Sequence, residues 1–408
     1  MSTGADRRLD LVVYGATSFV GQILCRRLVE RQGVDSDLRW AIAGRDRAKL
    51  DRVATETGAD VERIIADASD PAALRTMAEA TRVVVSTVGP YALHGSDLVE
   101  AVAEAGTDYC DLTGETQWMR RMIDAHSDTA ESSGARIVHA CGFDSIPSDL
   151  GVWHLQQRAL EQFGAPCESV SMRVANMRGG ASGGTVASMV NLMEEVSTDP
   201  TLRKLLADPY ALAPPDMRSG PTQPDIDRPR HDDASRQWVA PFVMAAVNTR
   251  VVHRTHALLG RPWGAGFTYD EAMLTGAGAL GAAKAGGLSA GLAAGMGLVM
   301  LGPTRRVLNR YVLPKSGEGP SPEAQERGSF ELRLFGTTAD GQTIRTRVTG
   351  DRDPGYGGTA RMLAEAAVAL VELDPDRVEG GFWTPASAFG DDLVDRLEAH
   401  AGIRFEVV

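Results

Sequence analysis

Short apolar segments alternate with amphipathic helical segments through the first 160 residues or so. Apolar, β-branched stretches predict strands at residues 9–16, 38–45, 61–67, 81–89 and 135–142. Helical patterns predict helices at 21–32 and 49–57, one that opens at Pro71, and one from Asp149 to Gln157. Strands that alternate with helices are typical of parallel βαβ units. The pattern therefore predicts an α/β fold with a Rossmann-type, doubly wound parallel sheet.

The pattern changes after about residue 165, where polar and apolar residues alternate along longer segments. Strands are expected at 169–177, 239–259, 329–338 and 342–351, a helix at 185–195, and a long loop at 208–236. Glu331 and Arg333 alternate with Leu332 and Leu334, as in an antiparallel sheet with one face in water. This part predicts a second, α+β domain that contains an antiparallel sheet.

The chain length also favours more than one domain, because 408 residues exceed what one hydrophobic core usually holds. We expect a Rossmann domain at residues 1–150 and a second domain at 151–352. The remaining segment, 353–408, carries helical patterns at 358–373 and 386–400. These C-terminal helices are predicted to return to the Rossmann domain and to enclose the middle region.

Composition and charge are those of an ordinary soluble enzyme, with 24% charged and 43% hydrophobic residues. The net charge of −12 and the absence of a basic cluster argue against a nucleic-acid partner. The first ten residues have no apolar segment, so no secretory signal is expected. A cytoplasmic location follows as the prediction, and the scattered cysteines are then reduced core thiols: Cys25, Cys110, Cys141 and Cys167.

The stretch from Leu274 to Gly302 is rich in Gly and Ala, and no charge occurs between Lys284 and Arg305. Its length is close to the minimum for a bilayer span, and its glycines have GxxxG spacing. Gly and Ala nevertheless give it weak hydrophobicity. We expect a buried or interfacial helix that folds against the body, with a transmembrane span or a lid that touches lipid as the alternatives.

A glycine turn follows the first strand and precedes a helix. Gly15 permits the tight turn, Gly21 lets the helix pack closely, and Ser18 replaces the usual middle glycine. The Ser18 hydroxyl can itself donate to a phosphate. A helix N-terminus at this point offers free N–H groups to a pyrophosphate. The predicted dinucleotide-binding residues of the turn are Gly15, Thr17, Ser18, Phe19, Val20 and Gly21.

The end of the second predicted strand distinguishes the two nicotinamide dinucleotides. NAD-binding folds place an acidic residue there for the ribose 2′-hydroxyl, whereas this chain has Arg45, with Lys49 beyond. A guanidinium can bind a 2′-phosphate through paired, charge-assisted hydrogen bonds. NADPH is therefore the expected cofactor. Asp46 keeps NAD open as an alternative, and a solvated basic turn is the non-binding interpretation.

The later strand ends complete the predicted cofactor site. Asp67, after the third strand, is placed to reach the adenine edge. The end of the fourth strand is expected beside the nicotinamide ribose, because ligands of such sheets bind at the carboxyl ends of the strands. The residues expected there are Ser86, Val88, Gly89 and Pro90.

Several longer stretches resemble the saccharopine dehydrogenase-like oxidoreductases, and within them the trans-acting enoyl reductases of actinobacterial lipid synthesis. The stretches are YGATSFVGQ, AGRDRAKL, STVGPYALHGSDLVEAVAEAGTDYCDLTGE, CGFDSIPSDLG, SGGT, KSGEGPSPE and TPASAFGDDLVDRL. They run from residue 14 to residue 397, so the resemblance covers nearly the whole chain. It is specific for the family and much less specific for the reaction.

The resemblance implies NADPH-dependent reduction of a carbon–carbon double bond on a lipid-like acyl chain. A polyketide synthase or an acyl carrier protein would present that chain, and residues 274–302 would supply any peripheral membrane contact. Two alternatives stay open: an enzyme acting on an amino-acid-type substrate, and a non-catalytic NADPH-binding protein associated with lipid. The following methionines either line a greasy channel or belong to the core: Met189, Met193, Met244, Met296 and Met300.

Enoyl reduction needs hydride at Cβ, a contact for the enolate oxygen, and a proton at Cα. Tyr91 follows Gly89-Pro90 and is expected near the nicotinamide face, as proton donor or carbonyl anchor. The Asp144-Ser145 pair is the competing catalytic candidate, with a structural loop carboxylate as the alternative for Asp144. The residues alone do not decide between them.

Two other chemistries are disfavoured. Residues 180–184 match the GxSxG pattern of a nucleophile elbow, and Asp232 with His253 or His256 could complete a triad. The Rossmann half, however, occupies the sheet that such a hydrolase would use, so a helix N-terminal turn capped by Thr185 is preferred. No metal-binding motif occurs, and His139 with Cys141 is expected in the core.

Overall fold

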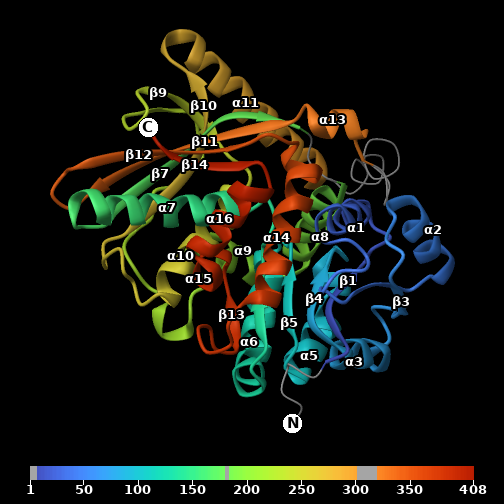
Figure 1. Ribbon diagram of the computed structural model, residues 1–408. Coiled ribbons are helices and arrows are strands. Elements are labelled where there is room, and N and C mark those ends of the chain that lie inside the picture. Colours follow the sequence, from blue (N-terminus) through green and yellow to red (C-terminus); the bar gives the residue numbers. More distant parts are fainter. Residues whose placement is uncertain (1–6, 180–182, 301–318) are drawn as a thin grey trace.

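Two seven-stranded sheets, here called A and B, form the framework of the molecule (Figure 1). The computed structural model describes residues 7–179, 183–300 and 319–408. Sheet A is built mainly from the first 140 residues, and sheet B mainly from the middle of the chain. The C-terminal segment contributes one strand to each sheet, β13 to A and β14 to B. The C-terminal segment therefore links the two sheets.

Sheet A is parallel throughout. Its spatial order is β13 (Gly381–Trp383), β6 (Arg136–Val138), β5 (Asp108–Asp111), β4 (Thr81–Ser86), β1 (Leu9–Tyr14), β2 (Trp40–Gly44) and β3 (Glu62–Ile65). In the register, Val13 of β1 lies opposite Ile42 and Val85. The order from β3 to β6 is that of dinucleotide-binding sheets. The predicted doubly wound parallel sheet is confirmed, with β5 and β13 as strands that the pattern did not predict.

Helices cover both faces of sheet A. On one face lie α1 (Phe19–Gln32), α2 (Arg47–Thr57) and α14 (Thr359–Glu372), and on the other α3 (Pro71–Ala80), α5 (Ser96–Ala105) and α6 (Thr116–Ser133). Leu24 and Leu28 share one side of α1 and are buried, which explains how the helical spacing becomes packing. A single turn, α4 (Tyr91–His94), connects β4 to α5.

Sheet B is mixed. Its order is β14 (Ile403–Val407), β12 (Thr343–Gly350), β11 (Ser329–Thr338), β7 (Cys167–Arg178), β10 (Thr268–Gly276), β9 (Gln237–Pro241) and β8 (Arg230–Asp232). All neighbours pair antiparallel except β7 and β10, which are parallel. Leu332 and Leu334 are buried while Arg333 is exposed, so the predicted wet face is present on β11.

The remaining helices lie around and between the sheets. They are α7 (Ile146–Phe163), α8 (Gly183–Thr198), α9 (Thr201–Ala207), α10 (Ala245–Leu258), α11 (Gly278–Met300), α13 (Pro322–Glu326), α15 (Pro385–Phe389) and α16 (Asp391–His400), with short helical turns at Pro215–Met217 and Pro354–Gly358. α7 packs on sheet B, and α10 packs on α7 and β10. These two helices bring the second sheet to the carboxyl edge of sheet A.

The strand predicted over 239–259 is wrong for most of its length. β9 ends at Pro241, and Ala245–Leu258 form the helix α10. Val247 and Val251, one turn apart, pack with the core below sheet A, while Val252 belongs to the other core. Because α10 is buried on nearly all sides, its polar residues do not gather on one exposed face, so the sequence has no amphipathic helical pattern. Its β-branched residues are also typical of a buried strand.

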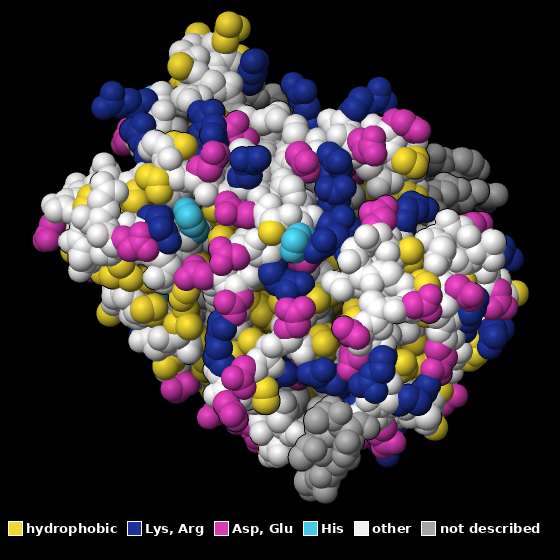
Figure 2. Space-filling view, viewed as in Figure 1, with side chains coloured by type: hydrophobic (Ala, Val, Ile, Leu, Met, Phe, Trp, Pro, Cys, Tyr) yellow, Lys and Arg dark blue, Asp and Glu magenta, His cyan; other side chains and the backbone are white. Residues whose placement is uncertain are grey.

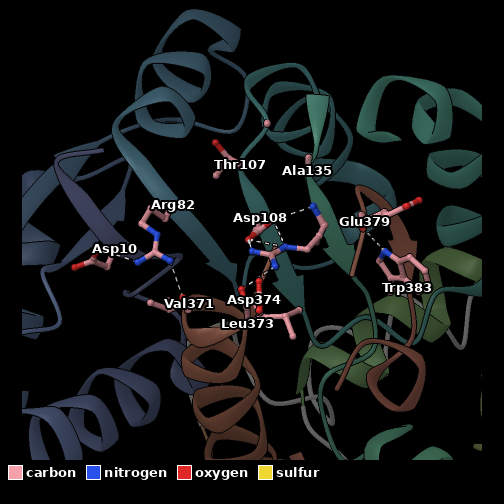
Figure 3. A network of polar contacts seen from close by, with 12 residues as sticks. Asp10, Arg82, Thr107, Asp108, Ala135, Val371, Leu373, Asp374, Glu379 and Trp383 are labelled. Atoms are coloured by element: carbon pink, nitrogen blue, oxygen red, sulfur yellow. Dashed lines mark hydrogen bonds and ion pairs between the residues drawn. The ribbon is translucent and has the colours of Figure 1, made fainter. Parts of the chain in front are cut away.

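Arginines at the amino ends of the strands of sheet A fix the end of α14 (Figure 3). Arg82 donates to the carbonyl oxygen of Val371 at 2.8 Å, and Arg136 donates to that of Leu373 at 2.9 Å. Asp108 pairs with Arg136 in the buried interior. Cations at a helix C-terminus satisfy its free carbonyls and its dipole. The helix α14 thus packs on α1 and β4, while the last strand, β14, joins sheet B.

The helix α11 lies on the surface, so of the buried or interfacial helix expected at 274–302 the buried form is wrong, and residues 274–276 still belong to β10. It packs on β9 and β10 along one side only, and Leu280 and Leu288 are 78% and 41% exposed. Figure 2 shows apolar side chains at the top of the molecule, where Figure 1 places α11. Within the described part of the chain, no helix has the length and hydropathy needed to cross a membrane. Gly302 lies outside the described residues.

Candidate functional site

The turn between β1 and α1 has the backbone of a dinucleotide-binding loop. Gly15 adopts φ +85°, a left-handed conformation that favours glycine. A Cβ atom on Gly15 would lie 2.6 Å from the Val88 side chain and 2.8 Å from that of Thr87. A Cβ on Gly21 would collide with the Gly15 carbonyl oxygen. Both glycines are therefore required by close approach, as the sequence predicted for this turn.

The Ser18 hydroxyl caps helix α1 and, contrary to expectation, does not stay free for a phosphate. Its hydroxyl oxygen accepts the N–H of Gly21 at 2.9 Å and so caps α1. Thr87 donates to the Gly15 carbonyl at 2.9 Å, which makes the Ser18 hydroxyl the donor in its own 2.9 Å contact with Thr87. The Ser18 proton is thus used within the protein, and the expected donation to a phosphate is not favoured.

Backbone N–H groups at the start of α1 remain for an anionic ligand. Those of Thr17, Phe19 and Val20 have no acceptor among the residues that the structure describes. Phe19 and Val20 lie in the first turn of this fourteen-residue helix and Thr17 directly precedes its N-cap, where the dipole favours negative charge. Together with the glycine cradle, they fit the pyrophosphate of a dinucleotide.

The end of β2 fits a 2′-phosphate better than a 2′-hydroxyl. Arg45 is exposed and has no hydrogen-bond or ion-pair partner in the described part of the chain, and Lys49 is likewise exposed. Asp46, the residue that kept NAD open, accepts the N–H of Lys49 at 3.0 Å and caps α2. Arg47 pairs with Asp51 one turn along. The Asp46 carboxylate is therefore used as the cap of α2, while the Arg45 guanidinium, unpaired within the described residues, remains free to bind a ligand.

Asp67 follows β3 and forms a tight turn with Ser69. Its Oδ1 accepts the backbone N–H of Ser69 at 2.9 Å and the Ser69 hydroxyl at 2.7 Å. These hydrogen bonds from Ser69 lower the pKa of Asp67, and the Arg45 guanidinium acts in the same direction. Asp67 and Arg45 therefore border the same part of the surface, at the adenosine end predicted for the cofactor.

The end of β4 lies directly beside the glycine turn. Val88 faces Gly15, and its N–H donates to the Ser86 hydroxyl at 3.4 Å. Ser86 is buried, whereas Gly89 is exposed and Pro90 partly exposed. The segment from Ser86 to Pro90 thus runs from the sheet interior to the surface next to the cofactor turn.

The position of Tyr91 does not favour the hypothesis that it supplies a proton. The side chain is buried, and its ring packs on Trp118 with centroids 5.3 Å apart. Its hydroxyl donates to the Ser86 carbonyl oxygen at 2.9 Å. Burial, and then the nearby Asp111 carboxylate, raise the pKa of Tyr91 well above its usual value. The phenol is therefore a neutral, internally bonded group of the fold.

Asp144 has the properties expected of an acid–base group. Its carboxyl lies 3.4 Å from the point where a Cβ on Gly114 would stand, in the loop that follows β5. That point is also 3.9 Å from Met244 and from Val247, both at the start of α10. Asp144 itself follows β6, is partly exposed, and has no hydrogen-bond donor among the described residues. Burial raises the pKa of this carboxyl to about 6.

Ser145, the other half of the predicted pair, is held inside the protein. Its hydroxyl donates to Oδ1 of Asn248 at 3.2 Å. Asn248 donates in turn to Glu271 at 2.9 Å, and Tyr269 donates to the same carboxyl at 2.7 Å. Burial raises the pKa of Glu271 to about 7. This network connects α7, α10 and β10 and fixes the loop that carries Asp144.

Sequence reasoning missed the polar groups at the end of β5. The carboxylate of Asp111 lies 2.7 Å from Nδ1 of His139 and accepts the N–H of Ala140 at 3.1 Å. Glu115 accepts the N–H groups of Tyr91 and Ala92, at 2.8 and 2.9 Å. The acidic positions of the stretch DYCDLTGE were the available signal, but β5 was not predicted. The expectation that His139 lies in the core is correct.

The hydrolase triad and the metal site, both disfavoured from the sequence, gain no support from the described residues. Residues 180–182 of the GxSxG match lie outside the described residues. Asp232 is paired with Arg173 at 2.7 Å in sheet B. His253 is buried with neither ring nitrogen hydrogen-bonded, and burial lowers its pKa to about 3. No group of metal-binding side chains occurs within the described residues.

Comparison with known protein families supports the cofactor assignment. Residues 11–138 match the model of the saccharopine dehydrogenase NADP binding domain. The match covers β1 through β6, which includes the glycine turn, Arg45 and the end of β4. The NADP-binding character of this domain is therefore established at the family level.

Comparison with curated proteins extends over the whole chain. A trans-acting enoyl reductase of Mycobacterium ulcerans (strain Agy99) is 40% identical over 413 residues, which are 97% of either chain. A trans-acting enoyl reductase of Mycobacterium tuberculosis (strain ATCC 25618 / H37Rv) is 40% identical over 411 residues, 96% of either chain. The similarity thus includes the second sheet and the C-terminal helices as well as the cofactor domain.

The fold is shared with a solved saccharopine dehydrogenase (L-Glu forming) from Saccharomyces cerevisiae. The TM-score is 0.52, with 98% of this chain and 100% of the yeast chain covered. Sequence identity is 11%, so this similarity concerns the fold alone.

Proposed function

Because this chain belongs to the trans-acting enoyl reductase family of saccharopine dehydrogenase-like oxidoreductases, we propose that it uses NADPH to reduce a carbon–carbon double bond of an acyl thioester. It is an NADP-binding oxidoreductase at the family level. The observation that carries the mechanism is the unpaired carboxyl of Asp144, with its pKa raised to about 6, at the carboxyl edge of sheet A. The proposal assigns this carboxyl the proton transfer.

The residues around the β1–α1 turn fit the dinucleotide. The N–H groups of Phe19 and Val20 would hold the pyrophosphate, and Gly15 would allow it to approach the backbone. Arg45 would bind the 2′-phosphate, with Lys49 adding charge. When bound, the reduced nicotinamide supplies the hydride. The residues from Ser86 to Pro90 would border the nicotinamide ribose.

The surroundings of Asp144 suit an acid that protonates an apolar substrate. The carboxyl shares the space next to Gly114 with the apolar side chains of Met244 and Val247. An apolar wall excludes water and keeps the carboxyl protonated to higher pH. In the proposed reaction, Asp144 donates its proton to Cα while the hydride reaches Cβ. The carboxylate then takes up a proton from solvent, which its partial exposure permits.

The names of the relatives also bear on the substrate. A reductase that acts in trans reduces a chain built on another protein, so we propose a polyketide synthase or an acyl carrier protein as the partner. The exposed apolar helix α11 supports a peripheral membrane contact, because an interfacial helix binds a bilayer through exposed apolar area. The amino-acid-type substrate and the non-catalytic alternative have no observation in their favour.

A deuterium-transfer assay tests the reaction. NADPH carrying deuterium at C4 of the nicotinamide is supplied with enoyl, ketoacyl and imine substrates, the acyl groups as carrier-protein thioesters. We expect deuterium at Cβ and a solvent proton at Cα of the enoyl substrate, with the other two unchanged. Reduction of the imine or the ketone in preference would overturn the proposal. Tight NADPH binding without turnover of any substrate would favour the non-catalytic alternative.

A further inference from the structure

A small cavity lies beyond the end of β6, between α6, α10 and β13, on the side of sheet A away from α14. Apolar side chains form most of its wall, among them Met119, Val251 and Phe382. The polar side chains that line it include His139 and Arg254. The cavity volume is about 10 Å³, which is about the space that one water molecule or a single small ion needs.

Arg254 carries a buried positive charge without an acidic partner among the described residues. Its guanidinium donates to the carbonyl oxygens of Leu212 and Phe382, and it forms no ion pair there. Asp124 acts on Arg254 from a distance, but Arg120 and Arg218 already bind that carboxylate. Burial, and then the charge of Arg218, lower the pKa of Arg254 to about 9. A buried charge of this kind is costly unless an opposite charge reaches it.

His139, which lines the same cavity, has a ring nitrogen without a hydrogen-bond partner among the described residues. Asp111 holds Nδ1 at 2.7 Å, while Nε2 is buried and has no hydrogen-bond partner. The ring is fixed between Trp118 and Phe382, with centroids 5.1 and 5.6 Å away. When Nε2 carries a ring proton, it can donate a hydrogen bond to a guest in the cavity.

We infer that the cavity between Arg254 and His139 binds a small inorganic monoanion of halide size. A water molecule would satisfy the hydrogen-bonding groups but would leave the charge of Arg254 uncompensated. An anion satisfies both the hydrogen bonds and the charge. A guest larger than a single small ion is excluded by the cavity volume and by the surrounding rings. The site is separate from the Asp144 carboxyl, which faces Gly114 at the other end of α10.

Crystals soaked in sodium bromide test the site directly. We expect an anomalous bromine peak within hydrogen-bonding distance of both the Arg254 guanidinium and Nε2 of His139. Density for water alone, with no bromine peak at high bromide concentration, would overturn the inference.

Thermal unfolding in solution supplies a second readout. Sodium chloride is compared with sodium gluconate at equal ionic strength, since gluconate is too large for the cavity. A ligand that binds only the folded state should raise the unfolding midpoint by about 2 °C in chloride. The difference should disappear in Arg254→Met, which keeps an apolar stem, and in His139→Gln, which tests the site if Arg254→Met does not fold.

Arg250→Met is the matched control. Arg250 lies one turn earlier on α10 and donates to the Leu206 carbonyl and to Thr249, away from the cavity. Its variant should keep the full chloride-dependent shift. Equal midpoints in chloride and gluconate for the wild type, or a shift unchanged in both cavity variants, would contradict the inference.

Discussion

The phenolic hydroxyl of Tyr91 donates a hydrogen bond to the carbonyl oxygen of Ser86, 2.9 Å away. This bond joins the first residue of α4 to the last residue of β4, below the Gly89-Pro90 turn. The same turn is held from the other side, because the N–H of Tyr91 donates to Glu115. Tyr91 therefore fixes the strand end that borders the proposed nicotinamide site. Its hydroxyl proton is engaged in the hydrogen bond to Ser86.

Tyr91→Phe should leave kcat within about threefold of the wild type and lower the free energy of unfolding by about 1 kcal/mol, the usual net value of one hydrogen bond. The ring and its packing on Trp118 are kept, so NADPH affinity should not change. Steady-state kinetics and urea unfolding check the two parts. A fall in turnover by about two orders of magnitude or more, at unchanged stability, would restore Tyr91 as the proton donor.

The glycine turn was accessible from the sequence, because it depends on local requirements. Gly15 must adopt a positive φ, and Gly21 must approach the turn, whatever the rest of the chain does. Arg45 could be identified for the same reason, since it directly follows a predicted strand. Residues with such local constraints are visible in a single sequence.

The catalytic candidates could not be decided in this way, since their roles depend on contacts between distant segments. Ser145 is fixed by Asn248, 103 positions along the chain, and Asn248 lies on a helix that was predicted as a strand. Tyr91 is turned inward by the ring of Trp118 on α6. Neither contact has a local signature, so the sequence alone could not decide between Tyr91 and the Asp144-Ser145 pair.

The proposed acid gives a definite pH dependence. The Asp144 carboxyl must be protonated to donate, and its pKa is raised to about 6. Its protonated fraction therefore falls about tenfold for each pH unit above 6. We expect kcat/KM for the enoyl substrate to fall in the same way when proton transfer limits the rate, as measured at saturating NADPH.

Asp144→Asn should lower kcat by about 10²–10⁴-fold and remove this pH dependence, because the amide keeps the shape of the side chain but has no acidic proton. NADPH affinity, measured by fluorescence titration, should stay within about twofold. An Asp144→Asn enzyme with normal turnover, or with the wild-type pH profile, would show that another group supplies the proton.

The cofactor preference rests on Arg45, which is exposed and unpaired within the described residues. NADPH should bind at least about tenfold tighter than NADH, and Arg45→Asp should abolish most of that difference. Arg47→Ala is the control, because Arg47 is also exposed but pairs with Asp51. Calorimetric titration with both nucleotides measures the ratio. Equal affinities in the wild type would contradict the NADP assignment.

Glu271 should make stability depend on pH near neutrality. Its folded-state pKa is raised to about 7 by burial, from an ordinary value of 4.5. A raised folded pKa means that the stability it provides is complete below about pH 4.5 and is lost as pH rises through 7. In Glu271→Gln, where the Tyr269 hydroxyl can turn to accept, this part of the pH dependence should disappear. Urea unfolding between pH 5 and 8.5 compares the two; identical slopes would contradict the assignment.

The exposed helix α11 predicts reversible binding to lipid vesicles. Leu280 and Leu288 are its most exposed leucines among the described side chains, and Lys284 is its only charged residue. Burial of their apolar surface in the membrane interface favours binding. In vesicle sedimentation, the double variant Leu280→Glu/Leu288→Glu should bind at least about tenfold more weakly than the wild type.

Leu160→Glu is the control, since Leu160 is 39% exposed on α7, away from α11. Equal loss of binding in the control would mean that added negative charge, and not α11, decides the contact. A wild-type protein that does not sediment with vesicles would exclude a lipid-binding role for this helix.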